Sequence, residues 1–228
     1  MALNIKEKLQ SLKSDIALQV KSVDRLEGEV KLLPVTKRQP IEKLELLYEL
    51  GERHFGENQV QEMNSKAEQL PKDIHWHLIG GLQSNKVKQA LQSADYIHSV
   101  DSIKLLERID RLAGELSKKP KIFLQVNVSG EESKQGFSPD ELIDALDLAK
   151  DKENLTVIGL MTMAVKAAGE ENNLRIFEDL RNLRDFFQKK YPNLQELSMG
   201  MSGDYIEAIQ AGSTYIRVGS ALLGDRLS

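Results

Sequence analysis

One lysine stands where a nucleophilic amine would be useful. Lys37 follows the apolar run Val30–Thr36, which is typical of a short buried strand. An ammonium group at the end of such a strand is costly to bury with its charge, so burial would lower the pKa of the Lys37 amine. A neutral amine is the nucleophile that forms Schiff bases with carbonyl compounds. The alternative is a Lys37 side chain that extends into solvent from a surface loop.

Two glycine-containing turns could bind an anion. The segment Ser198–Tyr205 contains two glycines, so its backbone N–H groups could approach a phosphate closely. Ser202 could cap the helix that follows and present its hydroxyl to the same anion. A second small turn, Gly219-Ser220, lies near the end of the chain. Ordinary surface turns are the alternative, but together with Lys37 the two turns indicate a ligand that carries a phosphate and a carbonyl group.

Alternating strands and helices must position these residues. Eight segments have the short apolar character of strands, and they are 30–37, 54–56, 75–79, 96–99, 121–128, 156–161, 196–199 and 215–218. Helical periodicity falls at 4–28, 41–50, 58–69, 84–92, 102–118, 138–151, 172–189 and 203–211. The alternation predicts right-handed βαβ units and a parallel sheet. Eight such units favour an α/β fold, a (β/α)₈ TIM barrel with an extra N-terminal helix. An open, doubly wound sheet is the alternative.

The side-chain alternation along the strands predicts which residues face the barrel interior. An apolar outer row at Ile122, Leu124 and Val126 turns Gln125 and Asn127 inward. By the same reasoning, three further residues face inward: His75, His77 and Arg217. The carboxyl ends of barrel strands form the mouth where active sites lie. The residues predicted at this mouth are Lys37, Asn58, Asn127, Met161, Met199 and Gly219.

The composition argues against a nucleic-acid-binding protein and against a membrane-spanning protein. The formal net charge of −4 gives no basic footprint for nucleic acid, and no apolar run is long enough to cross a membrane. The chain has no cysteine, and its first residues lack a signal sequence, so we expect a cytoplasmic location.

His75 and His77 lack a third ligand at useful spacing, so we expect no metal site. Residues 1–228 show no linker or repeat, which predicts one domain, and we expect a monomer.

Motifs along most of the chain resemble one known family. They are Leu33-Pro34-Val35-Thr36-Lys37, Phe55-Gly56-Glu57-Asn58, Trp76-His77-Leu78-Ile79-Gly80, Gln125-Val126-Asn127, Gly159-Leu160-Met161, Leu197-Ser198-Met199-Gly200-Met201-Ser202 and Arg217-Val218-Gly219. In this order they resemble the pyridoxal phosphate homeostasis protein family, which is similar in fold to the barrel domain of alanine racemase. The resemblance runs from about Leu33 to Gly224. Gly81 stands where the family often has a larger residue.

The resemblance implies a ligand and a role. Pyridoxal 5′-phosphate (PLP) would form a Schiff base with Lys37, and the remaining expected contacts are Asn58, Met199, Ser202, Arg217, Gly219 and Ser220. His77, Asn127 and Lys134 are secondary candidates. The family implies a cytoplasmic role in vitamin B6 and amino-acid balance without an established catalytic reaction. Apo-enzymes that use PLP are the expected recipients.

Arg217 bears on the choice between a carrier and an enzyme. The resemblance places its guanidinium at the pyridine nitrogen of PLP, and a guanidinium cannot accept a proton from that nitrogen. A neutral ring is a weak electron sink, which favours a carrier. The first alternative is a weak PLP-dependent amino-acid racemase that uses Tyr205 or Tyr215, although racemase relatives carry a further β domain for which a chain ending at Ser228 has no room. The second alternative is a Schiff-base aldolase acting on a sugar phosphate.

Overall fold

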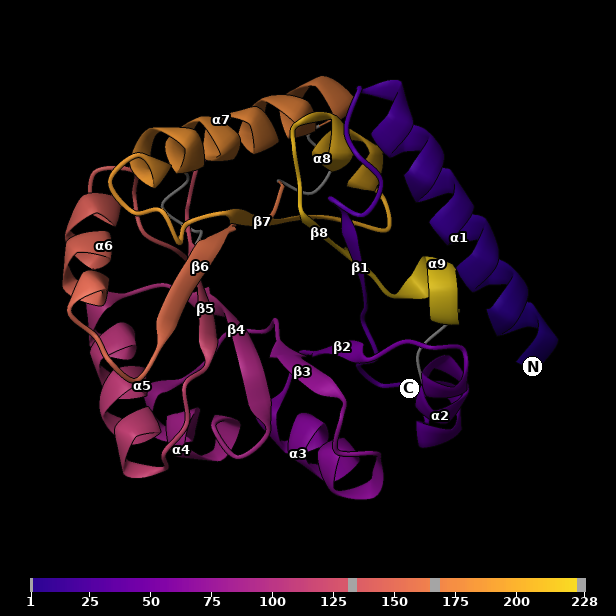
Figure 1. The fold of residues 1–228 in the computed structure, drawn as a ribbon, viewed down its shortest axis with the longest axis horizontal. Coiled ribbons are helices and arrows are strands. Elements are labelled where there is room, and N and C mark those ends of the chain that lie inside the picture. The colour runs from indigo at the N-terminus through magenta and orange to yellow at the C-terminus, as the bar shows by residue number, and fades with distance from the viewer. Residues whose placement is uncertain (1, 131–134, 165–168, 225–228) are drawn as a thin grey trace.

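Eight parallel strands form a closed ring in the computed structural model, which describes residues 2–130, 135–164 and 169–224. The strands are β1 (Lys31–Pro34), β2 (His54–Glu57), β3 (His75–Leu78), β4 (Ala94–Val100), β5 (Lys121–Gln125), β6 (Thr156–Met161), β7 (Glu196–Met201) and β8 (Tyr215–Val218). They pair in the order β1-β8-β7-β6-β5-β4-β3-β2, and a bridge between Val35 and Gly56 closes the ring (Figure 1). The predicted (β/α)₈ barrel is confirmed, and the open sheet is excluded.

Helices surround this barrel on its outer side (Figure 1). In the described part of the chain they are α1 (Ala2–Ser22), α2 (Ile41–Glu49), α3 (Val60–Gln69), α4 (Val87–Ala90), α5 (Ile103–Glu115), α6 (Leu142–Lys150), α7 (Glu170–Gln188), α8 (Tyr205–Gln210) and α9 (Ser220–Leu223), with a 3₁₀ turn η1 (Ser84–Lys86). The extra N-terminal helix is α1, as predicted. None of these described helices is long and apolar enough to span a membrane.

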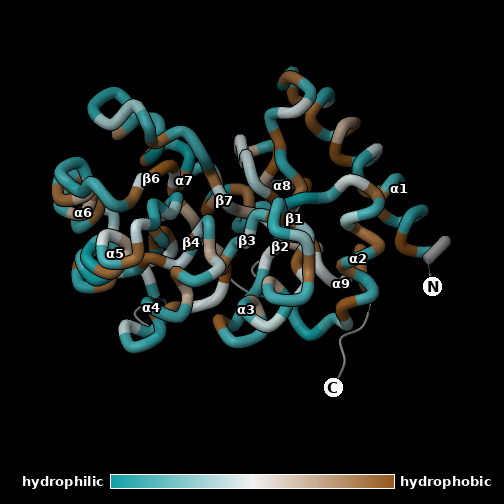
Figure 2. Tube along the Cα trace, turned by 60° about the horizontal axis from the view of Figure 1, so that its bottom comes forward, coloured by the Kyte–Doolittle hydropathy of each residue, from teal (hydrophilic) through white to brown (hydrophobic). Residues whose placement is uncertain are grey.

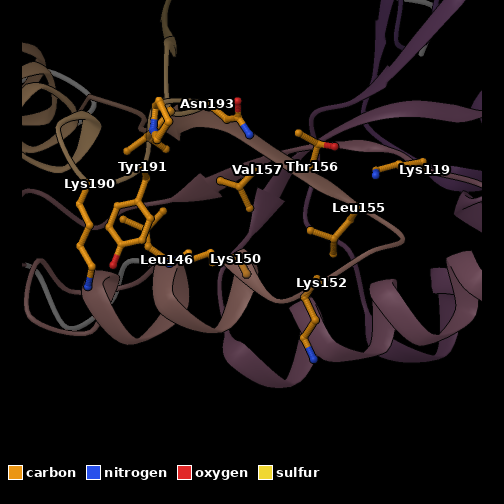
Figure 3. Close-up of a pocket in the computed structure, with 13 residues that line it drawn as sticks. Lys119, Leu146, Lys150, Lys152, Leu155, Thr156, Val157, Lys190, Tyr191 and Asn193 are labelled. Atoms are coloured by element: carbon orange, nitrogen blue, oxygen red, sulfur yellow. The ribbon is translucent and has the colours of Figure 1, made fainter.

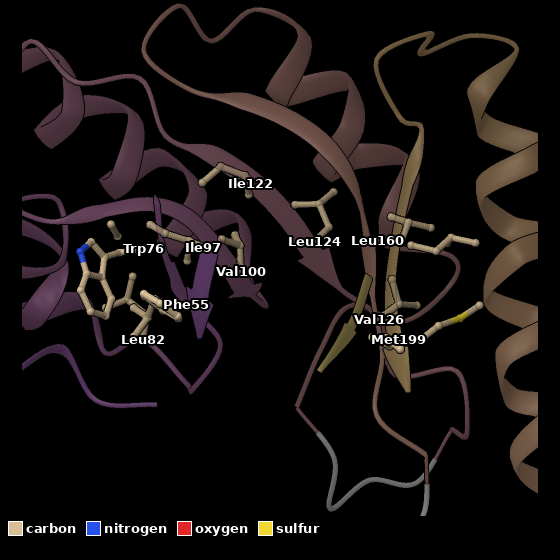
Figure 4. Packing of buried hydrophobic residues seen from close by; sticks show 14 of the residues in the cluster. Phe55, Trp76, Leu82, Ile97, Val100, Ile122, Leu124, Val126, Leu160 and Met199 are labelled. Carbon is tan, nitrogen blue, oxygen red and sulfur yellow. The ribbon is translucent and has the colours of Figure 1, made fainter. Parts of the chain in front are cut away.

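The main hydrophobic core lies between the barrel and the helices. Side chains from successive strands meet there, among them Ile97, Ile122, Leu124 and Leu160, all without exposed surface (Figure 4). The helices contribute apolar faces that alternate with hydrophilic residues along the trace (Figure 2). Burying each such aliphatic side chain stabilises the fold by roughly 1.5–3 kcal/mol relative to leaving it exposed. This layer holds the strands in place and thereby fixes the barrel mouth.

A second, smaller cluster fills the barrel interior. It consists of Leu33, Tyr96, Phe123, Met161 and Tyr215, all buried. Phe123 lies between Ile122 and Leu124 in sequence but on the opposite face of β5, because successive side chains of a strand alternate. The predicted outer and inner rows are therefore confirmed for this strand.

Some element boundaries differ from the prediction. The helix predicted at 4–28 ends at Ser22, because the chain turns at Asp24, which has a left-handed φ of 55°. The segment 84–92 forms a 3₁₀ turn and a single helical turn rather than one helix. Helix α9 was not predicted, since four residues are too few to show a period.

Candidate functional site

Lys37 lies at the mouth of the barrel, in a turn three residues beyond the end of β1. Its side chain is half-buried, and its Nζ donates a hydrogen bond to Oδ1 of Asn58 at 3.4 Å. Asn58 directly follows β2 and is exposed. Gly80 allows this arrangement, because a Cβ at that position would lie 2.1 Å from the Asn58 carbonyl oxygen. The structure therefore brings together the predicted amine and its predicted neighbour.

A buried ion cluster holds the turn before Lys37. The Lys66 ammonium donates to the Thr36 carbonyl oxygen at 2.7 Å and to Oε1 of Glu57 at 2.8 Å. The Thr36 hydroxyl donates to the same carboxylate oxygen at 2.6 Å. Burial raises the pKa of Glu57, and the positive charge of Lys66 opposes that shift. The backbone before Lys37 is thus fixed from two sides.

The turn is held on its far side as well. The backbone N–H of Arg38 donates to Oε1 of Glu62 at 2.6 Å, and Lys66 donates to the same oxygen at 2.7 Å. Arg38 has a left-handed φ of 54°, which this contact stabilises. Sequence reasoning missed the cluster. The sequence clue to this cluster was Lys66, which continues the three-residue spacing of the apolar residues Val60 and Met63. All three are buried on one side of α3.

The glycine-containing loop after β7 differs from its prediction in two ways. Helix α8 begins at Tyr205 with Asp204 as its N-terminal neighbour, so Ser202 does not cap it. The Asp204 carboxylate instead accepts a hydrogen bond from the backbone N–H of Met201 at 2.5 Å. Ser202 is half-buried within the loop, and its hydroxyl makes no hydrogen bond to any described residue. Gly200 has a φ of 92°, which favours glycine.

Met199 does not present its side chain to the mouth. The side chain is fully buried in the core between barrel and helices and extends toward the helical layer (Figure 4). The reason is alternation along β7, because Ser198 faces the interior and its neighbours must face outward. Any contact of Met199 with a ligand is therefore left to its backbone.

The turn after β8 lies beside the start of the Lys37 loop. A Cβ at Gly219 would lie 3.2 Å from the Val35 carbonyl oxygen, so a glycine allows β8 and β1 to approach closely here. Ser220 begins α9 and is exposed. Its hydroxyl, like that of Ser202, has no hydrogen-bond partner among the described residues. The Gln39 side chain donates to the Gly224 carbonyl oxygen at 3.4 Å, which joins the two loops again.

Arg217 points into the barrel, as predicted, and is 5% exposed. Its Nη1 donates to the carbonyl oxygen and to the hydroxyl of Ser198, both at 2.8 Å, and its Nη2 donates to the Thr162 carbonyl oxygen at 3.2 Å. Burial lowers the pKa of Arg217 to about 10, and the Asp204 carboxylate opposes the shift. The guanidinium therefore stays charged at neutral pH and is fixed in direction.

The secondary candidates lie in different places. His77 is fully buried in the barrel interior, below the mouth, where it stacks on Tyr96. His75 lies on the same row but at the amino end of β3, where its side chain is 51% exposed. Asn127 is half-buried at the mouth and accepts a hydrogen bond from the Ser129 hydroxyl at 3.1 Å. Lys134 lies outside the described residues.

Two hollows lie at opposite ends of β6. One of about 240 Å³ opens at the mouth beyond β5 and β6, and its lining includes Asn127 and Thr162. Another of about 250 Å³ lies beside Thr156, at the amino end of β6 and away from Lys37, where Lys150 and Tyr191 line it (Figure 3). The first hollow adjoins Thr162, whose carbonyl oxygen accepts a hydrogen bond from Arg217. The second plays no part in the candidate site.

The two tyrosines considered for racemase chemistry do not face the mouth. Tyr205 donates a hydrogen bond to Asp15 of α1, on the outer side of the barrel. Burial, together with this contact, raises the pKa of Tyr205 to about 12. Tyr215 is buried at the amino end of β8, at the opposite end of the barrel from Lys37. Neither hydroxyl is placed to act on a ligand beside the Lys37 amine.

Comparison with known proteins shows what the chain resembles. Residues 10–227 match the family model of the alanine racemase N-terminal domain. A pyridoxal phosphate homeostasis protein from Synechocystis is 42% identical over 208 residues, which are 89% of this chain and 94% of that protein.

Solved structures agree with this resemblance. PipY from Synechococcus elongatus was solved without PLP and with PLP bound, and these structures match with TM-scores of 0.88 and 0.84 at 39% and 38% identity. In both cases the match covers 96% of this chain and 100% of that one. An alanine racemase from Clostridium difficile, at 15% identity and a TM-score of 0.73, shares the fold alone; the match covers 99% of this chain and 57% of that one.

The resemblance predicted from the motifs is therefore confirmed over nearly the whole chain. The chain belongs to the pyridoxal phosphate homeostasis protein family, whose barrel is that of the alanine racemase N-terminal domain.

Proposed function

We propose that this protein binds PLP at the barrel mouth as a Schiff base on Lys37 and serves to hold and supply the cofactor. The observation that carries the proposal is the position of the Lys37 amine, half-buried beside Asn58 and in a loop that adjoins the turn after β8. A related protein, PipY, has been solved with PLP bound. An amine and an anion-binding loop at one mouth fit a ligand with an aldehyde at one end and a phosphate at the other.

The residues present fit the phosphate of PLP. Barrel phosphate sites are built from the loops after the seventh and eighth strands and a short extra helix, and α9 is such a helix. The hydroxyls of Ser202 and Ser220 have no hydrogen-bond partner among the described residues, so both can donate to an anion. Glycine at 219 leaves the backbone N–H groups of this turn accessible. These groups would hold the phosphate, and Asn58 would lie beside the cofactor.

Arg217 fits the pyridine nitrogen of PLP. A guanidinium carries five N–H groups, and three hydrogen bonds to Ser198 and Thr162 leave two for a ligand in the described structure. PLP supplies an electron sink for amino-acid chemistry when its pyridine nitrogen is protonated. Arg217 donates hydrogen bonds and cannot accept a proton, so it would hold that nitrogen neutral. This property supports a carrier over an enzyme.

The experiment that tests the proposal locates the covalent adduct. The purified protein incubated with PLP is expected to be yellow, and mass spectrometry after borohydride reduction is expected to find the pyridoxyl group on Lys37. Lys37→Ala should abolish the adduct, because no other amine lies beside Asn58 in the described mouth. Lys134→Ala, the matched control, should leave the adduct in place. An adduct on another lysine in the wild-type protein would contradict the proposal.

The racemase and aldolase alternatives are less well supported. Two-base racemisation needs a second proton donor at the substrate carbon, and Tyr205 and Tyr215 lie elsewhere. Production of D-alanine from L-alanine at an ordinary enzymatic rate would favour the racemase. A protein that stays colourless with PLP would favour the aldolase.

The cellular setting is part of the same proposal. We expect the protein to act in the cytoplasm as a monomer and to supply PLP to apo-enzymes that require it. The absence of cysteine is compatible with a reducing compartment. Transfer of PLP from the loaded protein to a PLP-dependent apo-enzyme, measured as recovered enzyme activity faster than from the same concentration of free PLP, would support this role.

A further inference from the structure

A continuous line of hydrogen-bonded side chains runs through the barrel interior. We call it the lumen relay, and its members, from the mouth downward, are Arg217, Ser198, His98, His77 and His54. The Ser198 hydroxyl lies 2.8 Å from Arg217 Nη1 and 2.8 Å from His98 Nδ1. His98 Nε2 lies 2.9 Å from His77 Nδ1, and His77 Nε2 lies 2.9 Å from His54 Nδ1. Each of the two inner imidazoles is contacted through both ring nitrogens, so the path is unbroken.

Aromatic rings enclose the middle of the lumen relay. His77 stacks on Tyr96 with ring centres 4.0 Å apart and 6° between the planes. His98 stacks on Phe123 with ring centres 4.1 Å apart and 24° between the planes. Both histidines are 0% exposed. In such surroundings hydrogen bonds strengthen one another, and an unpaired ring nitrogen would be costly. Apolar side chains would fill the same space at less cost, which indicates a purpose other than packing.

The direction of the hydrogen bonds follows from Arg217. A guanidinium only donates, so the Ser198 oxygen accepts a hydrogen bond from Arg217. His98 is the other hydrogen-bond partner of this hydroxyl among the described residues, so the Ser198 hydroxyl donates to His98. His98 Nδ1 is then an acceptor, and its hydrogen lies on Nε2. The same step repeats at His77 and at His54. We therefore assign all three imidazoles as neutral, with the hydrogen on Nε2.

The lower end of the lumen relay lies among charged groups. His54 is half-buried at the amino end of β2, and its Nε2 has no protein partner in the described residues. Burial lowers the pKa of His54 to about 4, and nearby positive groups add to the shift. The titratable groups at this end come from six other strands, and they include Lys31, His75, Asp95, Tyr96, Lys121, Glu196 and Tyr215. Lys31 donates to Glu196, and Lys121 donates to the Tyr96 hydroxyl.

We propose that the lumen relay conducts a proton between the cofactor side of Arg217 and the lower end of the barrel. Arg217 cannot accept a proton, so it orients Ser198 while water beside it gives a proton to the Ser198 oxygen and the Ser198 O–H proton passes to His98 Nδ1. The Nε2 protons of His98 and His77 each move to the next ring, and His54 releases its Nε2 proton to water. One proton enters and one leaves. Each imidazole then carries its hydrogen on Nδ1, and the reverse sequence returns one proton to the upper end, so the relay moves a single proton in each direction in turn.

This inference rests on the proposed function, because that proposal identifies PLP as the ligand at the upper end of the lumen relay. A PLP molecule held by Arg217, which has only donors to offer, would have a neutral pyridine nitrogen, and a proton on that nitrogen would pass to water at the upper end of the relay. With PLP covering the mouth, the lumen relay provides a route for that proton through the other end of the barrel. The relay residues position and transfer a proton; they do not contact the reacting aldehyde.

The test measures proton exchange in the protein without PLP. Nitrogen-15 NMR of labelled histidines is expected to show His77 and His98 neutral, with the hydrogen on Nε2. The exchange of these buried N–H protons with solvent is then followed in wild type and in His54→Gln. The glutamine amide can accept the hydrogen bond from His77 but passes no proton. Exchange at His98 should slow about tenfold or more, because protons then reach it only when the barrel opens.

Two further variants complete the test. His54→Phe removes both the hydrogen bond and the transfer, and it should slow exchange at least as much as His54→Gln. His75→Gln changes an exposed histidine beside His54 that is outside the relay, and it should leave exchange at His98 unchanged. Equal exchange in wild type and His54→Gln, or hydrogens on Nδ1 of His98, would overturn the proposal. Slower exchange in a protein that fails to bind PLP would uphold the relay and refute the cofactor assignment instead.

Discussion

At the scale of single residues, the Lys37 turn depends on a pair of buried charges that never touch the ligand site. The Glu57 carboxylate is 0% exposed, and the Lys66 ammonium is its cation. One Glu57 oxygen accepts from Lys66 and Thr36, and the other has no hydrogen-bond partner among the residues that the structure describes. Such a carboxylate is held in place only while its cation remains.

Lys66→Met is therefore expected to destabilise the protein by about 3–5 kcal/mol, because it leaves Glu57 as an uncompensated buried charge. The free energy of unfolding in urea measures the effect. Glu57→Gln in the same chain should recover part of the loss, since the amide carries no charge. Lys88→Met on the exposed face of α4 is the matched control and should stay within about 0.5 kcal/mol of wild type. A small loss in Lys66→Met would show that Glu57 is already protonated.

Residue types revealed part of the candidate site and not the rest. Lys37 and Arg217 were predicted because strand alternation and strand ends give direction and position from local sequence. The Glu57–Lys66 pair joins a strand to the following helix, and nothing in either segment alone says that the lysine turns inward. His77 was predicted to face inward, but its bonds to His54 and His98 cross three strands and depend on the register between them.

At the scale of elements, the β7–α8 connection shows why one glycine differs from its neighbour. A Cβ at Gly200 would lie 2.5 Å from the Ala208 Cβ and 3.2 Å from the Tyr205 Cα. Nothing lies within 4 Å of a Cβ built at Gly203. Gly200 allows α8 to pack closely on the end of β7, whereas Gly203 in the following loop has no such role.

Gly200→Ala should cost about 2 kcal/mol or more, since it combines a left-handed backbone with a steric clash against α8. Gly203→Ala should leave stability unchanged or raise it by about 0.4–1 kcal/mol through the unfolded chain. Thermal and urea unfolding of the two variants measure the difference. Equal losses in both would mean that the loop rearranges freely around Gly200.

The presence of a helix was easier to predict for long helices than for very short ones. The 13-residue α5 has a strong apolar face and lies within the predicted segment 102–118. The four residues of α9 carry no period, and the packing of Leu222 and Leu223 against the core determines that helix. The expected cap at Ser202 was wrong because a serine three residues before the helix is too far away, and the Asp204 carboxylate bonds within its own turn instead.

At the scale of the whole molecule, the interior histidines make stability depend on pH. Burial lowers the pKa of His77 and His98 well below the ordinary value of 6.5, and that of His54 to about 4. Above pH 6.5 these groups are neutral in both states, and their contribution to stability is fully present. As the pH falls below 6.5, the unfolded chain binds protons that the folded chain does not. Stability is therefore lost in that window, down to the folded pKa of each group.

The free energy of unfolding should fall by about 1.4 kcal/mol per pH unit for each of His77 and His98 at pH values clearly below 6.5. Urea titrations between about pH 7.5 and about pH 5.5 measure the slope. His98→Gln should lower stability throughout and reduce the slope. Burial raises the pKa of Glu57 and Asp204, and protonation of these carboxyl groups gives the opposite trend as the pH falls. A flat profile would contradict neutral interior histidines.

The position of α1 has a consequence for how the protein is made. This first helix buries Ile5, Leu9, Ile16 and Val20, and it lies beside α8 and α9, the last helices described (Figure 1). Arg25, just beyond it, donates to the carbonyl oxygen of Ile209 at 3.1 Å. As the ribosome releases the chain from its beginning, α1 emerges with an apolar face whose partners have yet to be synthesised. Helix α1 is translated before α8 and α9, so it can reach its final place only after they have been made.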